Sequence, residues 1–213
     1  MVPIDRAKYM DATEVRQLRT FSEHAALKDL RAGRITGVLA WAVVDTALST
    51  GLRVSELARL TVGDFDAKRG SLRVTRLKRK KSTTETLAMG QELVAHLREF
   101  IAWKEQVGQP AGRNDALFVG KRGALTAYGL QRIWKRAIAR AGLPKELSIH
   151  SARHTMAVHL LRKTSNLRLV QKQLGHASPA TTANMYADIS FADMQAGVSG
   201  LYTDTAERQT SGK

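Results

Sequence analysis

The chain has 213 residues and a formal net charge of +15, because 34 lysines and arginines outnumber 19 acidic residues. The 43% hydrophobic content is typical of a globular protein, and the basic excess favours a phosphate-rich partner. Cysteine is absent, which excludes disulfides and thiolate chemistry. The longest apolar run, residues 38–44, is far shorter than the ~20 residues of a membrane-spanning helix. We therefore expect a cytoplasmic protein that does not enter a membrane.

Two helices are predicted at the N-terminal end of the chain. Asp11 followed by Glu14 resembles a capping box, and the helix that it starts should run to about Arg31. A second helix over residues 35–49 is apolar on most faces, so it should be central and buried. Gly51 supplies the residue that closes it.

A short third helix should begin near Ser55, after which the periodicity changes to that of strands. Apolar and polar residues alternate from Ser71 and again over residues 84–88. The basic run Lys-Arg-Lys-Lys-Ser at 78–82 separates the two stretches. This pattern predicts a β-hairpin with a strongly basic turn.

The rest of the chain is mainly helical by its spacing. Residues 108–115 form a predicted loop, and 116–119 can be a short strand or an extended piece. The predicted helical segments are 91–101, 126–138, 151–162, 167–174, 181–186 and 191–195. We expect a mainly α domain with one small antiparallel β-hairpin, in the α+β class.

Several kinds of catalytic machinery are missing from the sequence. No glycine-rich loop ends in Gly-Lys-Ser/Thr, which argues against nucleotide hydrolysis. The acidic residues form no obvious trio for two metal ions, and the pair His150 and His154 lacks the glutamate of a zinc-protease helix. We therefore expect no metal and no other cofactor.

Residues that can carry chemistry stand near predicted helix ends. Arg53 follows a helix stop, and His150 and Arg153 are three residues apart, on one face of a helical turn. His176 comes directly after another helix end, and Tyr186 follows ten residues later. Taken singly, an arginine, histidine or tyrosine in such a place is more often structural than catalytic.

Together and in this order, three segments resemble the signature regions of the tyrosine recombinases, or phage-type integrases. They are Thr-Gly-Leu-Arg-Val-Ser-Glu-Leu at 50–57, His-Ser-Ala-Arg-His-Thr at 150–155, and Leu-Gly-His-Ala-Ser-Pro-Ala-Thr-Thr-Ala-Asn-Met-Tyr at 174–186. A hairpin lysine lies between the first two, as in that family. The resemblance extends from about residue 10 to about residue 200 and implies the fold of the family's catalytic domain.

The resemblance implies a role for each matched residue. Arg53 and Arg153 correspond to the two arginines that clamp the scissile phosphate, and Tyr186 corresponds to the nucleophile. His150 corresponds to the general acid/base histidine, and His176 to the second histidine that supports the transition state.

The matched general-acid lysine and the supporting residues are located less directly. Counting forward along the hairpin favours Lys78, whereas counting back from the returning strand favours Lys80, and Lys81 is a further alternative. Glu56 corresponds to a carboxylate behind Arg53, and His154 to a structural neighbour. The remaining candidates would contact the DNA backbone or form a solvated charge run: Arg79, Lys80, Lys81, Lys121 and Arg122.

The implied activity is site-specific cleavage and rejoining of double-stranded DNA through a 3′-phosphotyrosyl intermediate, without metal or ATP. Alternatives are a type IB topoisomerase-like enzyme, a catalytically silent DNA-binding relative, and a basic RNA-binding module.

We expect residues 1–202 to form the catalytic domain with no preceding DNA-clamping domain, and residues 203–213 to form a polar tail. The resemblance implies a homo-oligomer on DNA, a tetramer, and we expect the free chain to be a monomer. The apolar stretch 189–202 can either dock on a neighbouring subunit or pack on its own domain.

Overall fold

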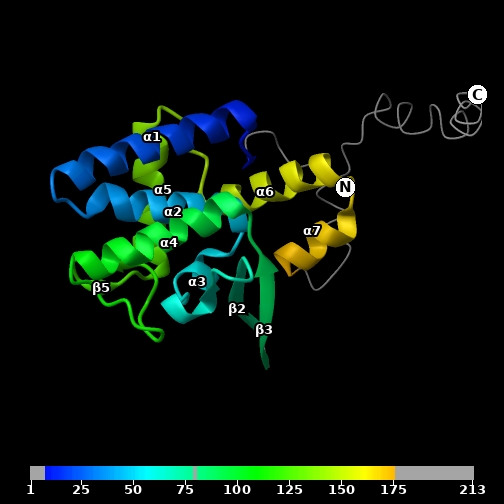
Figure 1. Ribbon diagram of the computed structural model, residues 1–213. Coiled ribbons are helices and arrows are strands. Elements are labelled where there is room, and N and C mark those ends of the chain that lie inside the picture. Colours follow the sequence, from blue (N-terminus) through cyan, green and yellow to red (C-terminus); the bar gives the residue numbers. More distant parts are fainter. Residues whose placement is uncertain (1–7, 79–80, 176–213) are drawn as a thin grey trace, which may run out of the picture.

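A computed structural model describes residues 8–78 and 81–175, and Figure 1 shows helices surrounding α2 with a small sheet at one side. The helices are α1 (Ala12–Arg31), α2 (Thr36–Thr50), α3 (Val54–Leu57), α4 (Gln91–Gln106), α5 (Ala127–Arg140), α6 (Ile149–Thr164) and α7 (Leu167–Leu174). The strands are β1 (Phe65–Asp66), β2 (Ser71–Lys78), β3 (Lys81–Ala88), β4 (Val119–Gly120) and β5 (Gly123–Ala124). The expected mainly α architecture with small antiparallel sheets is confirmed.

The N-terminal helices follow their capping signals. The Asp11 carboxylate accepts hydrogen bonds from the backbone amides of Thr13 and Glu14, and the Glu14 carboxylate accepts one from the Asp11 amide, so the predicted capping box is present. Helix α2 ends at Gly51, which adopts the left-handed conformation with φ +63°.

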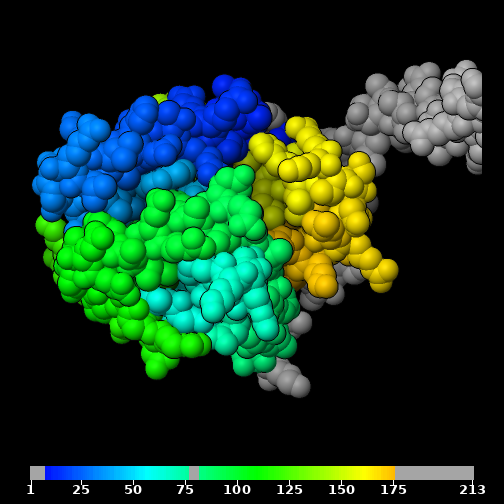
Figure 2. Space-filling model, in the orientation of Figure 1, coloured from blue at the N-terminus to red at the C-terminus, as the bar shows by residue number. Residues whose placement is uncertain are grey.

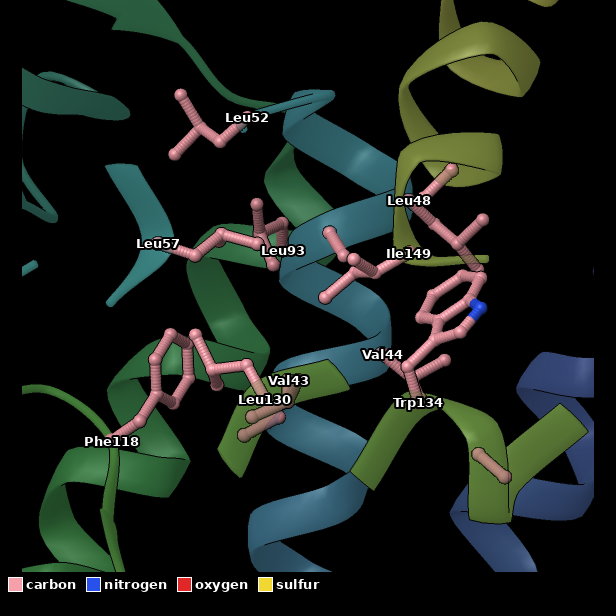
Figure 3. Close-up of a cluster of buried hydrophobic side chains, with 14 of the residues drawn as sticks. Val43, Val44, Leu48, Leu52, Leu57, Leu93, Phe118, Leu130, Trp134 and Ile149 are labelled. Carbon is pink, nitrogen blue, oxygen red and sulfur yellow. The ribbon is translucent and has the colours of Figure 1, made fainter. Parts of the chain in front are cut away.

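The hydrophobic core is built around α2, as its apolar faces predicted. In Figure 3, Val43, Val44 and Leu48 of α2 lie among side chains of other helices. Trp134 of α5 is fully buried there, and its indole Nε1 donates a hydrogen bond to the Leu147 carbonyl oxygen at 3.0 Å. Burying that nitrogen with its partner avoids the cost of an unpaired polar group in the core.

The hairpin pairs β2 with β3, and β1 adds a third strand at the outer edge of β2. Leu72 lies opposite Leu87, and the register continues until Lys78 lies opposite Lys81. The strands therefore extend into the basic run, which was predicted to be the turn. Strands β1 and β5 were not predicted, because two-residue strands leave no period in the sequence.

The C-terminal helices described are α6 and α7. Helix α6 begins at Ile149, so His150 lies in its first turn, and α7 ends at Gly175 with φ +62°, as expected. The predicted helices at 181–186 and 191–195 lie outside the described residues. Within the described part of the chain, no helix has the length and apolar character to cross a membrane.

Candidate active site

The first arginine of the site follows the turn that closes α2. Its backbone amide and its guanidinium both donate to the carboxylate of Glu56: Arg53 N to Oε2 at 2.8 Å, and Nη1 to Oε1 at 2.9 Å. The Glu56 side chain is only 4% exposed, whereas that of Arg53 is 44% exposed. A buried carboxylate thus fixes an arginine that still faces solvent, which leaves most of its five N–H donors for another anion.

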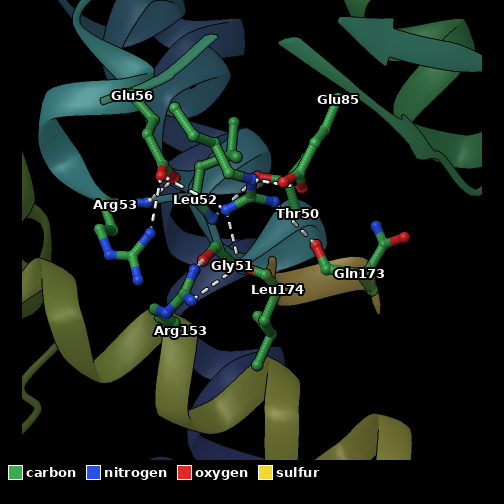
Figure 4. A network of polar contacts seen from close by, with 10 residues as sticks. Thr50, Gly51, Leu52, Arg53, Glu56, Glu85, Arg153, Gln173 and Leu174 are labelled. Atoms are coloured by element: carbon green, nitrogen blue, oxygen red, sulfur yellow. Dashed lines mark hydrogen bonds and ion pairs between the residues drawn. The ribbon is translucent and has the colours of Figure 1, made fainter. Parts of the chain in front are cut away.

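The second arginine, Arg153, comes from the buried face of α6. Its Nη1 donates to the carbonyl oxygen of Gly51 at 2.8 Å, and its Nη2 donates to the carbonyl oxygen of Leu174 at 2.8 Å. Burial, followed by the neighbouring charge of Arg53, lowers the pKa of Arg153 to about 10, so it stays cationic at neutral pH. One guanidinium therefore joins the ends of α2 and α7 (Figure 4).

A third arginine, which was not predicted, lies between these two. Arg76 of β2 is 2% exposed, and its Nε donates to Glu85 Oε2 of β3 at 2.6 Å. Its Nη1 donates to the Leu174 carbonyl oxygen at 2.6 Å and to Glu56 Oε1 at 3.3 Å. Alternation along β2 places this position with the buried Leu72 and Val74. This alternation in the sequence could have predicted that Arg76 is buried and therefore paired with acidic residues.

The hairpin also meets α7 through a second contact. The side-chain amide of Gln173 donates to the carbonyl oxygen of Ala88 at 2.9 Å. Gly175 fits against the Arg76 guanidinium so closely that an added Cβ would overlap it. In Figure 2, the surface of α7 lies next to that of the hairpin, in agreement with these contacts.

The predicted histidines differ in their surroundings. His150 is exposed in the first turn of α6, three residues before Arg153. His154 is partly buried, and its Nδ1 has no hydrogen-bond partner among the residues described. Burial, followed by the charge of Arg153, lowers the pKa of His154. His176 and Tyr186 lie outside the described residues.

The basic residues beyond this cluster fall into two groups. Lys78 and Lys81 are the last backbone pair of the hairpin, and Arg79 and Lys80 lie outside the described residues. Lys121 and Arg122 are exposed in the turn between β4 and β5, which Figure 1 shows at the opposite side of the molecule from α7. The structure therefore separates this second pair from the arginine cluster.

The arrangement is a cationic site whose charges are partly neutralised from behind by Glu56 and Glu85. Planar guanidiniums held by buried acceptors suit a phosphodiester, because they can donate two parallel hydrogen bonds to its oxygens. Over residues 8–78 and 81–175, no group of three or more histidine, aspartate or glutamate side chains is placed to hold a metal ion.

A model of the phage integrase family matches residues 8–193 of this chain, including the segments that carry the arginine cluster. The chain belongs to the phage integrase family. Among curated relatives, the tyrosine recombinase XerC of Actinobacillus pleuropneumoniae serotype 7 is 32% identical over 187 residues, which are 86% of this chain and 55% of that protein.

Solved recombinase structures share the fold of this integrase-family chain. The crystal structure of XerA recombinase superimposes with a TM-score of 0.70 at 25% identity, over 89% of this chain and 63% of that one. XerH bound to its difH substrate in a pre-cleavage complex gives 0.65 at 24% identity, over 90% and 52% of the two chains. The chain spans about half the length of the curated relatives it matches. The recombinase names of these relatives and structures do not favour the type IB topoisomerase-like alternative.

Proposed function

We propose that residues 1–202 form the catalytic domain of a site-specific DNA recombinase, which cleaves and rejoins strands through Tyr186. The observation that carries this proposal is the meeting of Arg53 and Arg153, from two distant signature segments, around Glu56 and the end of α7. The family and the recombinase names of its relatives support the same activity. The polar residues 203–213 would form a tail outside this domain.

The two arginines would stabilise the pentavalent phosphorus of the transition state. Negative charge grows there on the non-bridging oxygens, and a preorganised donor aimed at such charge contributes about 2.7–4 kcal/mol in comparable sites. Glu56 would hold Arg53 in place, and the carbonyl oxygens of Gly51 and Leu174 would hold Arg153. The cationic side chains would thus take the place of metal ions in binding the phosphate.

The reaction exchanges one phosphoester for another. The Tyr186 oxygen attacks phosphorus and gives up its proton to His150, while the bond from phosphorus to the 5′ oxygen breaks and that oxygen takes a proton from a lysine. His176 would donate a hydrogen bond to the transition state. Rejoining reverses these steps with a second 5′-hydroxyl, so no ATP is needed.

The hairpin register bears on which lysine supplies the proton. Lys78 is two positions beyond Arg76 in β2, and Lys81 is its backbone partner in β3. Lys80 falls in the two-residue connection between the strands. This register supports Lys78, with Lys81 as the second candidate, and His154 would help to hold α6.

The partner would be double-stranded DNA in the cytoplasm, bound by a tetramer that forms from monomers on two DNA sites. The XerH structure is of a recombinase bound to its substrate, and the +15 charge suits a phosphate backbone. Hairpin residues 79–81 would contact the backbone near the site, and Lys121 and Arg122 would contact it elsewhere. Light scattering of the protein alone, and of the protein mixed with DNA that it cleaves, measures this change in assembly.

Covalent trapping tests the proposed reaction. The protein is incubated with 5′-labelled, nicked duplexes that tile the DNA flanking its gene, and adducts are resolved on denaturing gels. We expect the labelled strand to migrate with the protein, because a 3′-phosphotyrosyl bond retains its 5′ end. Tyr186→Phe should abolish the adduct without weakening binding, whereas Tyr128→Phe, at an exposed tyrosine of α5, should not.

The outcomes separate the alternatives. An adduct that survives Tyr186→Phe contradicts the assigned nucleophile, and tight DNA binding without any adduct indicates a silent relative. Relaxation of supercoiled plasmid without a specific site indicates topoisomerase-like activity. Binding of RNA in preference to DNA, with no effect of Arg53→Ala beyond a small loss of affinity, indicates an RNA-binding module.

A further inference from the structure

Arg76 shares an acceptor with each of the other two arginines. The Glu56 carboxylate oxygen Oε1 accepts from both Arg53 and Arg76, and the Leu174 carbonyl oxygen accepts from both Arg76 and Arg153. We propose that Arg76 is a positioning residue of the reaction, which fixes the lysine hairpin against the two phosphate-binding arginines. This inference rests on the proposed function.

Arg76 lies in a buried junction and is not a solvated charge. We define the junction as Arg76 with its partners Glu56, Glu85, Gln173 and Leu174. A buried cation costs free energy unless it is paired and hydrogen-bonded. Two carboxylates, Glu56 and Glu85, balance its charge, and the carbonyl oxygens of Leu174 and Gln173 lie 2.6 and 3.4 Å from its terminal nitrogens. A lysine has one ammonium on a flexible stem and cannot reproduce this fork.

The segments that Arg76 joins are those that the reaction has to align. It lies in β2, two residues before Lys78, and its ion pair with Glu85 reaches the opposite strand. Its bond to Leu174 reaches the last residue of α7, two positions before His176. Its bond to Glu56 reaches the carboxylate that orients Arg53. Loss of Arg76 should therefore loosen the basic end of the hairpin, while the bonds from Arg153 to Leu174 and from Gln173 to Ala88 remain.

Gly175 offers an independent way to disturb the same junction. Its φ is +62°, and a Cβ there would overlap the Arg76 guanidinium. Gly108 has φ +68° and has nothing within 4 Å of an added Cβ, so it is a matched control for the backbone cost alone. Gly175→Ala keeps Arg76 in the sequence but should displace it.

The first measurement is the single-turnover rate of adduct formation, with DNA affinity and thermal unfolding measured on the same preparations. The variants are Arg76→Gln, Arg76→Lys and Gly175→Ala. Their controls are Gly108→Ala and Arg73→Gln, a half-exposed arginine of the same strand that pairs with Asp64. We expect the three junction variants to cleave about 100-fold more slowly, the loss typical of one preorganised donor, with DNA affinity within about threefold of the parent.

The second measurement asks whether the slow step is proton delivery by the hairpin. In a 5′-bridging phosphorothiolate duplex, sulfur replaces the leaving oxygen, and a thiolate departs without needing a proton. On this substrate, the Arg76 variants, Gly175→Ala and Lys78→Ala should recover to within about tenfold of the parent, whereas Arg153→Gln should not. A merely structural defect would slow both substrates alike.

Each outcome decides between the two proposals. If the parent forms adducts and the folded Arg76 variants match it, or stay equally slow on both substrates, the positioning role is wrong and the proposed function stands. If Arg76→Gln does not fold, Gly175→Ala decides in the same way. If the parent forms no adduct on either substrate, the proposed function fails and this inference fails with it.

Discussion

Arg153 donates a hydrogen bond to the carbonyl oxygen of Gly51 at 2.8 Å, across 102 positions of the sequence. Gly51 is also the left-handed residue that ends α2, and a Cβ added to it would lie 2.8 Å from Cδ2 of Leu174. The same residue thus stops a helix, accepts from a predicted phosphate-binding arginine and contacts the end of α7.

Gly51→Ala should therefore destabilise the protein by more than the backbone cost of placing alanine in the left-handed conformation. Gly33 has the same φ of +63° but nothing within 4 Å of an added Cβ, so Gly33→Ala measures that cost. We expect about 1 kcal/mol for Gly33→Ala and at least about twice that for Gly51→Ala, from guanidinium unfolding curves. Equal losses would show that Leu174 moves aside freely.

Arg153→Lys should impair cleavage although the charge is retained. One ammonium cannot hold the carbonyl oxygens of both Gly51 and Leu174 and still present a planar face to a phosphate. We expect single-turnover cleavage to fall by about 100-fold or more, because a preorganised donor is lost from the transition state. Arg162→Lys, at an exposed position of the same helix, should leave the rate unchanged. Comparable rates for both variants would contradict a phosphate-binding role for Arg153.

Much of the fold could be predicted because local signals set its boundaries. The Asp11 capping box and the closing glycines Gly51 and Gly175 lie where the sequence placed them. The hairpin and the position of its basic turn were found from the alternation, but the turn was predicted too long, because charged lysines can also occupy strand positions at a sheet end.

The candidate site was predicted only in part. Family motifs identified Arg53, Glu56 and Arg153, which the structure brings together. Arg76 was missed because it stands outside those motifs, and its partners lie in three other segments. Local spacing in the sequence does not predict such long-range pairs. Only the alternation of β2 indicated that the Arg76 side chain faces inward.

A second buried charge, Asp45, was also missed, because it stands within the apolar helix α2. Its carboxylate is 1% exposed and accepts from Arg19 at 2.8 Å and from His96 Nδ1 at 2.7 Å. Trp41 stacks on His96 with ring centroids 4.8 Å apart, and the Arg19 guanidinium lies over the same indole. The cluster joins α1, α2 and α4 away from the arginine site.

Asp45→Asn should destabilise the protein without changing the chemistry of cleavage. The amide keeps the shape but leaves Arg19 and His96 without an anionic partner. We expect a loss of about 2 kcal/mol, less than for a fully buried pair because the Arg19 side chain is 36% exposed. Asp66→Asn is the control, because Asp66 is 46% exposed and lies 4.0 Å from Arg69, so its loss should be near zero. Similar unfolding midpoints for the two variants would show that the Asp45 cluster adds little.

His154 should make the protein less stable in mild acid. Burial, then the charges of Arg153, His150 and Lys8, lower its folded pKa below the ordinary 6.5. Between those two pKa values the unfolded chain binds more protons, so the free energy of unfolding should decrease as pH falls through about 6.5 toward the folded pKa. Above that window His154 is neutral in both states and contributes no pH dependence.

Urea unfolding at about pH 7.5 and about pH 5.5 measures this effect, with His154→Gln as the variant that removes it. The pKa of His159 is also lowered by burial, so some acid sensitivity should persist in that variant. We expect the stability difference between the two pH values to shrink in His154→Gln. Among the residues described, the buried Nδ1 of His154 has no hydrogen-bond partner. An unchanged stability difference would therefore mean that protonated His154 gains a partner that compensates for its burial.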